Sequence, residues 1–340
     1  MAAPVTLLNQ VSLSEFTDLV AKDFKMNQTM IPMVAGQLFI EDDLAAHTGN
    51  TRRYDEVDTE TYADLKREGA DAAKARVGVG YNITMTARRF AKEIDITWEM
   101  RRHNKAPEVV GQLTALNHYC SQRMEINLTH RITFGNATTY VDRDGETVTI
   151  TVGDGLALFS AVHTLRHSAI TYRNTVAGAP VASQGALESA ELLTTTDILS
   201  NFGERRVMDF NVVWSGNDPN TVRTIRQILE STADIDAAHE GVTNVFKGKY
   251  RHIVLPNLAT TALGANDATK RRWWGIAAVG QGVLGWQAYH GIWERPNLKT
   301  PAPGNNGEDV HNDNWTFGAR CEDGVAILSG RGIIASLVAS

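Results

Sequence analysis

The 340-residue sequence predicts an α+β fold, and three observations lead to this prediction. Apolar residues recur every three or four positions from Pro107 to Phe134, which is typical of a long amphipathic helix. Apolar and polar residues alternate around Val77–Met85 and again near the C-terminus, as expected of half-buried strands. From Gly155 onward, strand patterns and helix patterns follow one another.

The composition excludes several classes of protein. Lys and Arg number 33 against 39 Asp and Glu, a net charge of −6, which argues against a protein whose main task is binding nucleic acid. Two cysteines, Cys120 and Cys321, cannot form a disulfide framework and indicate reduced core residues. No signal peptide is recognisable, and the longest apolar stretch, Gly275–Trp286, is too short to span a membrane. We therefore expect a soluble chain that is not exported.

A short helix and an irregular arm are expected at the N-terminus. Leu13, Phe16 and Val20 fall near helical spacing within residues 12–25. Between residues 27 and 50 the pattern breaks, and the apolar residues there have no large local partner. An arm of this kind needs another surface to lie on.

The composition changes at Arg52. From Arg52 to Lys105 the chain holds 12 basic and 10 acidic residues, from which no core can be built. Alternating apolar residues on either side of a polar, glycine-bearing tip at 66–78 predict a long two-stranded excursion. Because a two-stranded ribbon is marginal alone in water, it either rests on a neighbour or is a solvated surface hairpin. The local sequence leaves both interpretations open.

The clearest helix covers residues 107–134. Pro107 suits the first helical position, and Gly135 ends the pattern. At 1.5 Å per residue the helix spans roughly 40 Å, a length typical of a structural strut. A hairpin follows, with Asp144-Gly145 as its tight turn.

Mixed α and β elements are predicted in the remainder of the chain, each from its periodicity and its flanking turn residues. They are a strand at 205–216, a helix started by Asp218-Pro219, a strand at 250–256, a short helix at 257–264, and a C-terminal β region at 314–340 with turns at Asp323-Gly324 and Ser329-Gly330.

A formal dinucleotide-binding pattern is present at Gly280, Gly282 and Gly285. In such a site the glycines allow the backbone to approach a pyrophosphate, and an acidic residue follows about 20 positions later. The corresponding region here is a loop without that acidic residue. We therefore favour a packed loop and expect no cofactor.

Two histidines, His163 and His167, stand four residues apart and would share one face of a helix, as two metal ligands must. Asp154 is within reach as a third ligand, but the glutamate of a metal-dependent hydrolase motif is absent. Polar packing is therefore preferred, and no metal is expected. A basic run, Lys270-Arg-Arg272 before Trp273-Trp274, resembles a nucleic-acid contact, yet on an acidic chain it indicates a solvated rim or an intersubunit contact.

The order of these parts resembles the major capsid proteins of tailed bacteriophages, which have the Hong Kong 97-like fold, and especially the Mu-like major head subunits. Two segments carry the resemblance locally, DGLALFSAVHTLRHSA at 154–169 and YRHIVLPNLATTAL at 250–263. The resemblance covers essentially the whole chain. It implies a structural protein without enzymatic activity, catalytic residues or cofactors.

The resemblance also implies a division of the chain. Its parts are an N-terminal arm at 1–50, an extended β-hairpin loop at 51–104, a peripheral domain at 105–154 and 311–340 that contains a spine helix at 107–134, and an axial α/β domain at 155–310.

Shell assembly explains a mixed-charge ribbon and an arm, because neighbouring copies complete both. Individually weak, salt-sensitive ion pairs between subunits are then expected from the hairpin charges. The candidates are Arg52, Arg53, Asp55, Glu56, Lys66, Arg67, Lys74, Arg76, Arg88 and Arg89.

Further partners follow from the same resemblance. We expect pentamers and hexamers in a capsid lattice, a separate scaffolding protein, a portal, a possible decoration protein, and double-stranded DNA packaged without sequence-specific binding. No N-terminal cleavage and no membrane contact are expected. The lysine–asparagine cross-link of some family members is not carried over, because no matching asparagine is found. The protein would be made in the host bacterial cytoplasm and end in the virion.

Three other functions remain as alternatives. An encapsulin-like compartment uses the same fold but encloses protein cargo. A metal-dependent hydrolase would use His163, His167 and Asp154, and a cofactor-binding oxidoreductase would use Gly280, Gly282 and Gly285.

Overall fold

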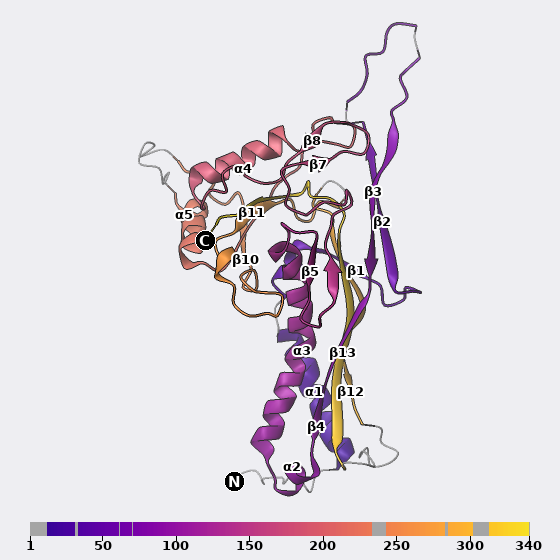
Figure 1. Ribbon diagram of the computed structural model, residues 1–340, viewed down its shortest axis with the longest axis vertical. Helices are drawn as coiled ribbons and strands as arrows, with labels where there is room; N and C mark the ends of the chain where they lie inside the picture. The colour runs from indigo at the N-terminus through magenta and orange to yellow at the C-terminus, as the bar shows by residue number, and fades with distance from the viewer. Residues whose placement is uncertain are drawn as a thin grey trace.

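The computed structural model describes residues 12–30, 33–60, 62–69, 71–232, 243–282, 285–301 and 313–339. The molecule is elongated, with a long sheet and its helices at one end and a second sheet with two helices at the other (Figure 1). A two-stranded hairpin extends beyond both (Figure 1). The chain is therefore mixed α and β, as its sequence predicts.

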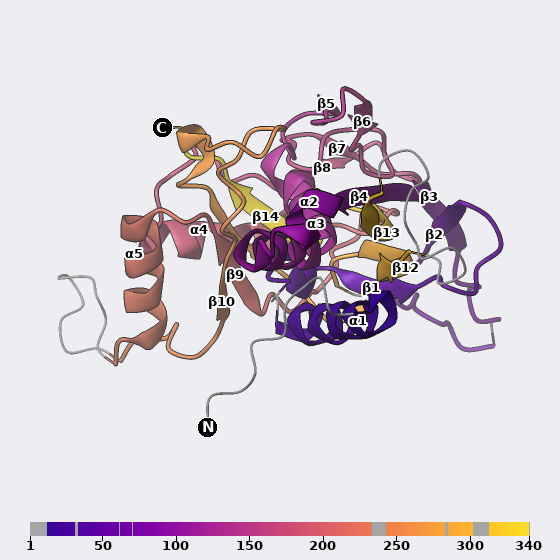
Figure 2. The ribbon, with the colours of Figure 1, turned by 90° about the horizontal axis from the view of Figure 1, so that it is seen from below.

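The first half of the molecule is a four-stranded sheet with its helices. Its elements are α1 (Leu13–Met30), η2 (Ala35–Leu38), β1 (Ile40–Asp43), β4 (Arg88–Ile96), α2 (Trp98–Arg102), α3 (Ala106–Thr133), β12 (Ala288–Lys299) and β13 (Trp315–Ile327). The strand order is β1-β12-β13-β4, with only β1 and β12 parallel. Figure 2 shows α3 nearly end on, with α1 and the long sheet beside it. Phe16, Leu116 and Phe317 belong to the apolar core between these helices and the sheet.

Helix α3 confirms the helix predicted at 107–134. Pro107 lies in its first turn, where a missing N–H costs nothing. Its buried apolar residues are Val109, Leu116, Cys120, Met124, Leu128 and Ile132. The first four pack with the long sheet, whereas Leu128 and Ile132 share a second core with Trp214. One helix therefore joins the two halves of the molecule.

A second sheet, with strand order β10-β9-β11-β14, forms the other half. Its elements are α4 (Gln184–Thr196), β9 (Val212–Ser215), α5 (Pro219–Glu230), β10 (Arg251–Val254), β11 (Trp274–Ala277) and β14 (Ile333–Ser336). Val213 packs with α4 and α5, whereas Val212 packs in the core shared with α3, as expected of alternating strand residues. Asp218 caps α5 as predicted, accepting from the Thr221 N–H at 2.9 Å.

The charged excursion is a hairpin of β2 (Thr51–Thr59) and β3 (Val77–Thr86), antiparallel with a register shift between Asp55 and Val57. The predicted Asp-Gly hairpin is formed by β5 (Thr139–Val141) and β6 (Thr147–Thr149). The remaining short elements are β7 (His163–Thr164), β8 (Thr171–Tyr172) and η4 (Ala268–Lys270).

The N-terminal arm differs from its prediction. Helix α1 continues to Met30, and β1 adds a strand to the long sheet. Ala35, Leu38 and Phe39 are buried in the core that α3 shares with the second sheet. The described part of the arm therefore lies on its own chain and needs no neighbouring copy as a surface.

Two further local predictions are wrong. Residues 257–264 form turns instead of a helix, because the Thr261 N–H bonds the Ala265 carbonyl at 2.7 Å. Asp323-Gly324 lies inside β13 and forms no turn, since Gly324 pairs with Gly291 of β12. A Cβ on Gly324 would come within 2.9 Å of Met85 Cγ, so this glycine serves close packing.

Acid is expected to destabilise the fold through His130 of α3. Burial lowers the pKa of His130 from 6.5 to about 4. Because the unfolded chain binds the proton more tightly, the stability that His130 contributes is full above pH 6.5 and is lost as the pH falls toward 4. The loss is about 2–3 kcal/mol. Urea unfolding at several pH values should show a shallower slope for His130→Gln, and an unchanged slope would contradict the assignment.

Candidate functional site

The predicted contact charges lie along the hairpin and at its base. Lys66, Arg67 and Lys74 are exposed on the distal segment. Four other charges form ion pairs within the chain, with N–O distances of 3.0 Å for Arg76–Glu60, 2.6 Å for Arg53–Asp55, 3.8 Å for Arg89–Glu294 and 4.0 Å for Arg52–Asp42. Exposed pairs of this kind contribute under about 1 kcal/mol each. Their role between subunits stays a prediction.

Glu56 differs from the other candidates because it is buried. Its side chain and that of Arg331 are each only 2% exposed, and the two form an ion pair within the chain. Arg331 also donates to the Asn201 side-chain oxygen at 2.7 Å. Glu56 therefore attaches the hairpin to the body of its own subunit, and we remove it from the set of intersubunit candidates.

The face of the hairpin that carries Glu56 makes several contacts with the second half of the molecule. The Asp58 carboxylate accepts from the Asn201 N–H at 2.8 Å and lies 4.0 Å from the Arg206 guanidinium. A Cβ on Gly80 would come within 2.4 Å of the Glu56 carboxylate, so only glycine allows this approach. We call the residues that hold this face the hairpin seat: Thr164, His167, Asn201, Arg206 and Arg331.

Arg88, at the start of β4, is also engaged within the chain. It donates to the buried Asp142 carboxylate at 2.8 Å, and Arg123 of α3 bonds the same carboxylate. Burial raises the pKa of Asp142, but these hydrogen bonds outweigh it and hold the pKa below its usual value. Arg88 therefore joins β4 to the β5–β6 hairpin.

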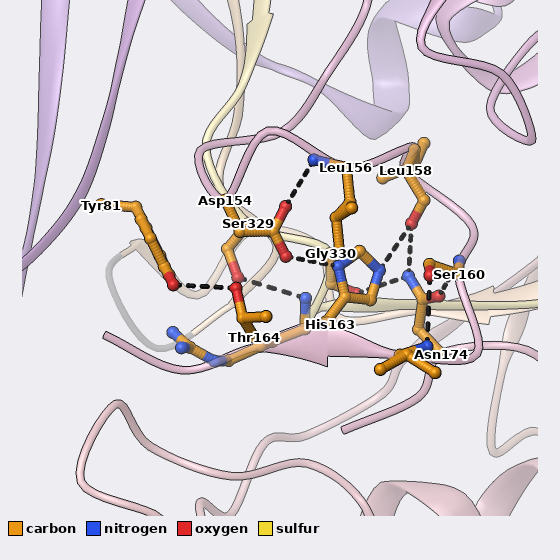
Figure 3. Close-up of polar contacts among 12 residues, drawn as sticks. Tyr81, Asp154, Leu156, Leu158, Ser160, His163, Thr164, Asn174, Ser329 and Gly330 are labelled. Atoms are coloured by element: carbon orange, nitrogen blue, oxygen red, sulfur yellow. Dashed lines mark hydrogen bonds and ion pairs between the residues drawn. The ribbon is translucent and has the colours of Figure 1, made fainter. Parts of the chain in front are cut away.

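The two histidines do not form a metal site. His163 lies in β7, not on a helix, and its Nδ1 contacts the Asp154 carboxylate at 2.8 Å while Nε2 faces the Leu158 carbonyl at 3.2 Å (Figure 3). His167 points elsewhere: its Nε2 contacts the Val79 carbonyl of β3 at 3.2 Å, and its ring stacks on Phe202. The prediction of a shared helix face is wrong, because residues 163–172 form a short β-hairpin.

The same region instead positions the extended hairpin. Tyr81 of β3 hydrogen-bonds Thr164 at 2.9 Å, next to the buried His163 (Figure 3). Asn174 holds the surrounding loops by donating to the Leu158 and Gly330 carbonyls at 2.6 and 3.1 Å. His163 therefore organises the loops around the hairpin seat, and His167 belongs to the seat itself.

The sequence analysis did not find Asn201, Arg206 or Arg331, because they lie at least 115 residues after the hairpin. One signal was available for Arg331. It is the only charge in the otherwise apolar and small stretch Ile327–Ser336, which is typical of a buried cation with a partner.

The glycine motif and the basic run have structural roles. Gly280 and Gly282 have positive φ in the connection from β11 to β12, and Gly285 leads to a strand where a dinucleotide site requires a helix. Trp273 and Trp274 are buried, so neither ring can stack on a base. Lys270 packs over the Phe134 ring at 4.0 Å.

Two absences concern the described residues only. Within them, no cluster of three or more His, Cys, Asp or Glu side chains could hold a metal ion. No helix among them is long and apolar enough to span a membrane.

No protein-family model and no curated protein matches the chain. Solved structures do match. A chain of the mature capsid of bacteriophage PhiM1 is 10% identical with a TM-score of 0.52, over 90% of this chain and 87% of that one. A chain from Mycobacterium phage Patience is 11% identical with a TM-score of 0.50, over 98% and 94%. A chain from the capsid of Ralstonia phage GP4 is 13% identical with a TM-score of 0.49, over 89% and 87%.

At such low identity the comparison concerns the fold. The match covers nearly the whole of each chain, so the arrangement of both sheets, the helices and the hairpin is compared together. The chain has the α+β, Hong Kong 97-like fold of phage capsid proteins that its sequence predicts.

Proposed function

We propose that this chain is the major capsid protein of a tailed phage, which assembles into pentamers and hexamers of an icosahedral shell around double-stranded DNA. The full-length match to a phage capsid chain carries the proposal. The hairpin supports it, since one face is fixed to the body while the distal segment exposes Tyr62, Leu65 and Val77. Apolar side chains held away from their own core are suited to contact a neighbouring copy.

The division into domains is part of the same proposal. Residues 1–50 are the arm, 51–104 the extended loop, 105–154 and 311–340 the peripheral domain, and 155–310 the axial domain. The separate long and second sheets support the two domains. Strand β14 pairs with β11 of the second sheet, so the C-terminal segment connects both.

The partners proposed are further copies of this chain, a scaffolding protein, a portal and a possible decoration protein. DNA would lie inside without sequence-specific contacts, in keeping with a net charge of −6. The chain would act in the virion, after synthesis in the host bacterial cytoplasm, as a structural protein without catalysis.

Electron microscopy and light scattering of the purified protein, expressed alone and with its neighbouring genes, test this function. Closed shells or capsomer-sized rings are the expected result. Particle diameter separates a genome-sized head from a small encapsulin-like compartment. A monodisperse monomer or dimer in both preparations would overturn the proposal.

A further inference from the structure

Cys120 and Cys321 face each other between α3 and β13. Both are buried in the core of the long sheet and neither is in a disulfide. Two residues farther along β13, Asp323 accepts from Asn127 of α3 at 3.1 Å, so the helix and the strand lie side by side here. The two cysteine side chains are in hydrogen-bond contact, with the Cys321 thiol donating to the Cys120 sulfur.

One of the two sulfur atoms has a route to small solutes. Cys120 lines a groove of about 690 Å³, together with Arg89, Lys92, Arg123 and Arg143, whereas Cys321 is not among its lining residues. Basic side chains around a thiol favour the thiolate, which is the reactive form. The hydrogen bond from Cys321 lowers the pKa of the Cys120 thiol, and the same bond together with burial raises the pKa of Cys321.

We propose that Cys120 and Cys321 are a redox modification site, at which hydrogen peroxide converts the two thiols into a disulfide between α3 and β13. The Cys120 thiolate attacks one peroxide oxygen, the O–O bond breaks, and the products are a sulfenic acid on Cys120 and one water. The Cys321 thiol then attacks the sulfenic sulfur, the S–S bond forms, the S–O bond breaks, and a second water leaves. The thiols lose two electrons in total, and the peroxide gains them.

The bond would stabilise the fold. It closes a loop of about 200 residues and so restricts the unfolded chain much more than a short-range disulfide. This chemistry does not depend on the proposed function. In a shell protein, the pair would pass from a reducing cytoplasm into an oxidising medium, where disulfides persist.

The test treats the reduced full-length protein with hydrogen peroxide and follows free thiols, intact mass and the melting temperature. The expected result is joint loss of both thiols, a mass decrease of two hydrogen atoms in a single chain, and a peptide that links Cys120 to Cys321. The melting temperature rises by several degrees and returns to its original value on reduction.

Single variants separate the two roles. Cys321→Ser should accumulate a sulfenic acid on Cys120 that dimedone captures, whereas Cys120→Ser should leave Cys321 unmodified. Alanine variants replace them where a serine variant does not fold, and the wild-type linkage is decisive in either case. Disulfides formed only between chains, or retention of both thiols in peroxide, would overturn the proposal.

Discussion

Replacing Arg331 by methionine is expected to lower the free energy of unfolding by about 3–5 kcal/mol, because the substitution leaves a carboxylate buried without its cation. Glu56 and Arg331 are both 2% exposed, so water cannot take the place of the lost guanidinium. The substitution also removes the hydrogen bond to Asn201 and the contact of Arg331 with the Tyr172 ring. Urea unfolding of the purified protein measures the loss.

Two matched variants give this result its meaning. The double variant Glu56→Met/Arg331→Met should recover at least half of the loss, since replacing both members of a buried pair is often neutral. Arg53→Met removes a cation from the exposed Arg53–Asp55 pair and should cost under about 1 kcal/mol. An Arg331→Met protein as stable as wild type would show that the pair does not hold the hairpin.

Local pattern was sufficient wherever an element's partners are near in sequence. The long helix, the Asp-Gly hairpin and the Asp218 cap each depend on residues within one or two turns, and the structure contains all three. The helix predicted at 257–264 failed for the same physical reason, because its Ala- and Thr-rich pattern does not reveal a competing turn hydrogen bond to Ala265.

The candidate site was less predictable, because it depends on pairings between distant segments. The sequence treated the charges of 51–104 as one group with one role. The structure separates Glu56, which is buried against Arg331, from Lys66 and Arg67, which are exposed. Nothing local distinguishes them, since the register shift after Asp55 and the glycines opposite determine which side chains face the body.

The two histidines show the same limit. Their spacing of four suits a helix, and only the pairing of β7 with β8 reveals that they point to different partners. His167 then contacts the hairpin backbone, a role that no motif encodes.

The double variant Tyr62→Ser/Leu65→Ser is expected to raise the critical concentration for assembly at least tenfold. Tyr62 is 62% exposed and Leu65 is 90% exposed in the single chain, so neither contributes to its core. In a shell, burying a leucine side chain against a neighbour stabilises each contact by about 1.5–3 kcal/mol, and 1.4 kcal/mol corresponds to tenfold in an equilibrium constant. Light scattering over a series of protein concentrations measures the change.

The control for this variant is the chain itself, since its stability and its assembly respond to different residues. Surface substitutions usually change the free energy of unfolding by less than about 0.5 kcal/mol, so the variant should melt like wild type. Tyr62→Phe/Leu65→Met keeps the apolar area and should assemble at the wild-type concentration. Normal assembly of the serine variant would show that this segment stays in solvent. The hairpin seat would then serve only the fold of the single chain, and the contacts between copies would have to come from other surfaces.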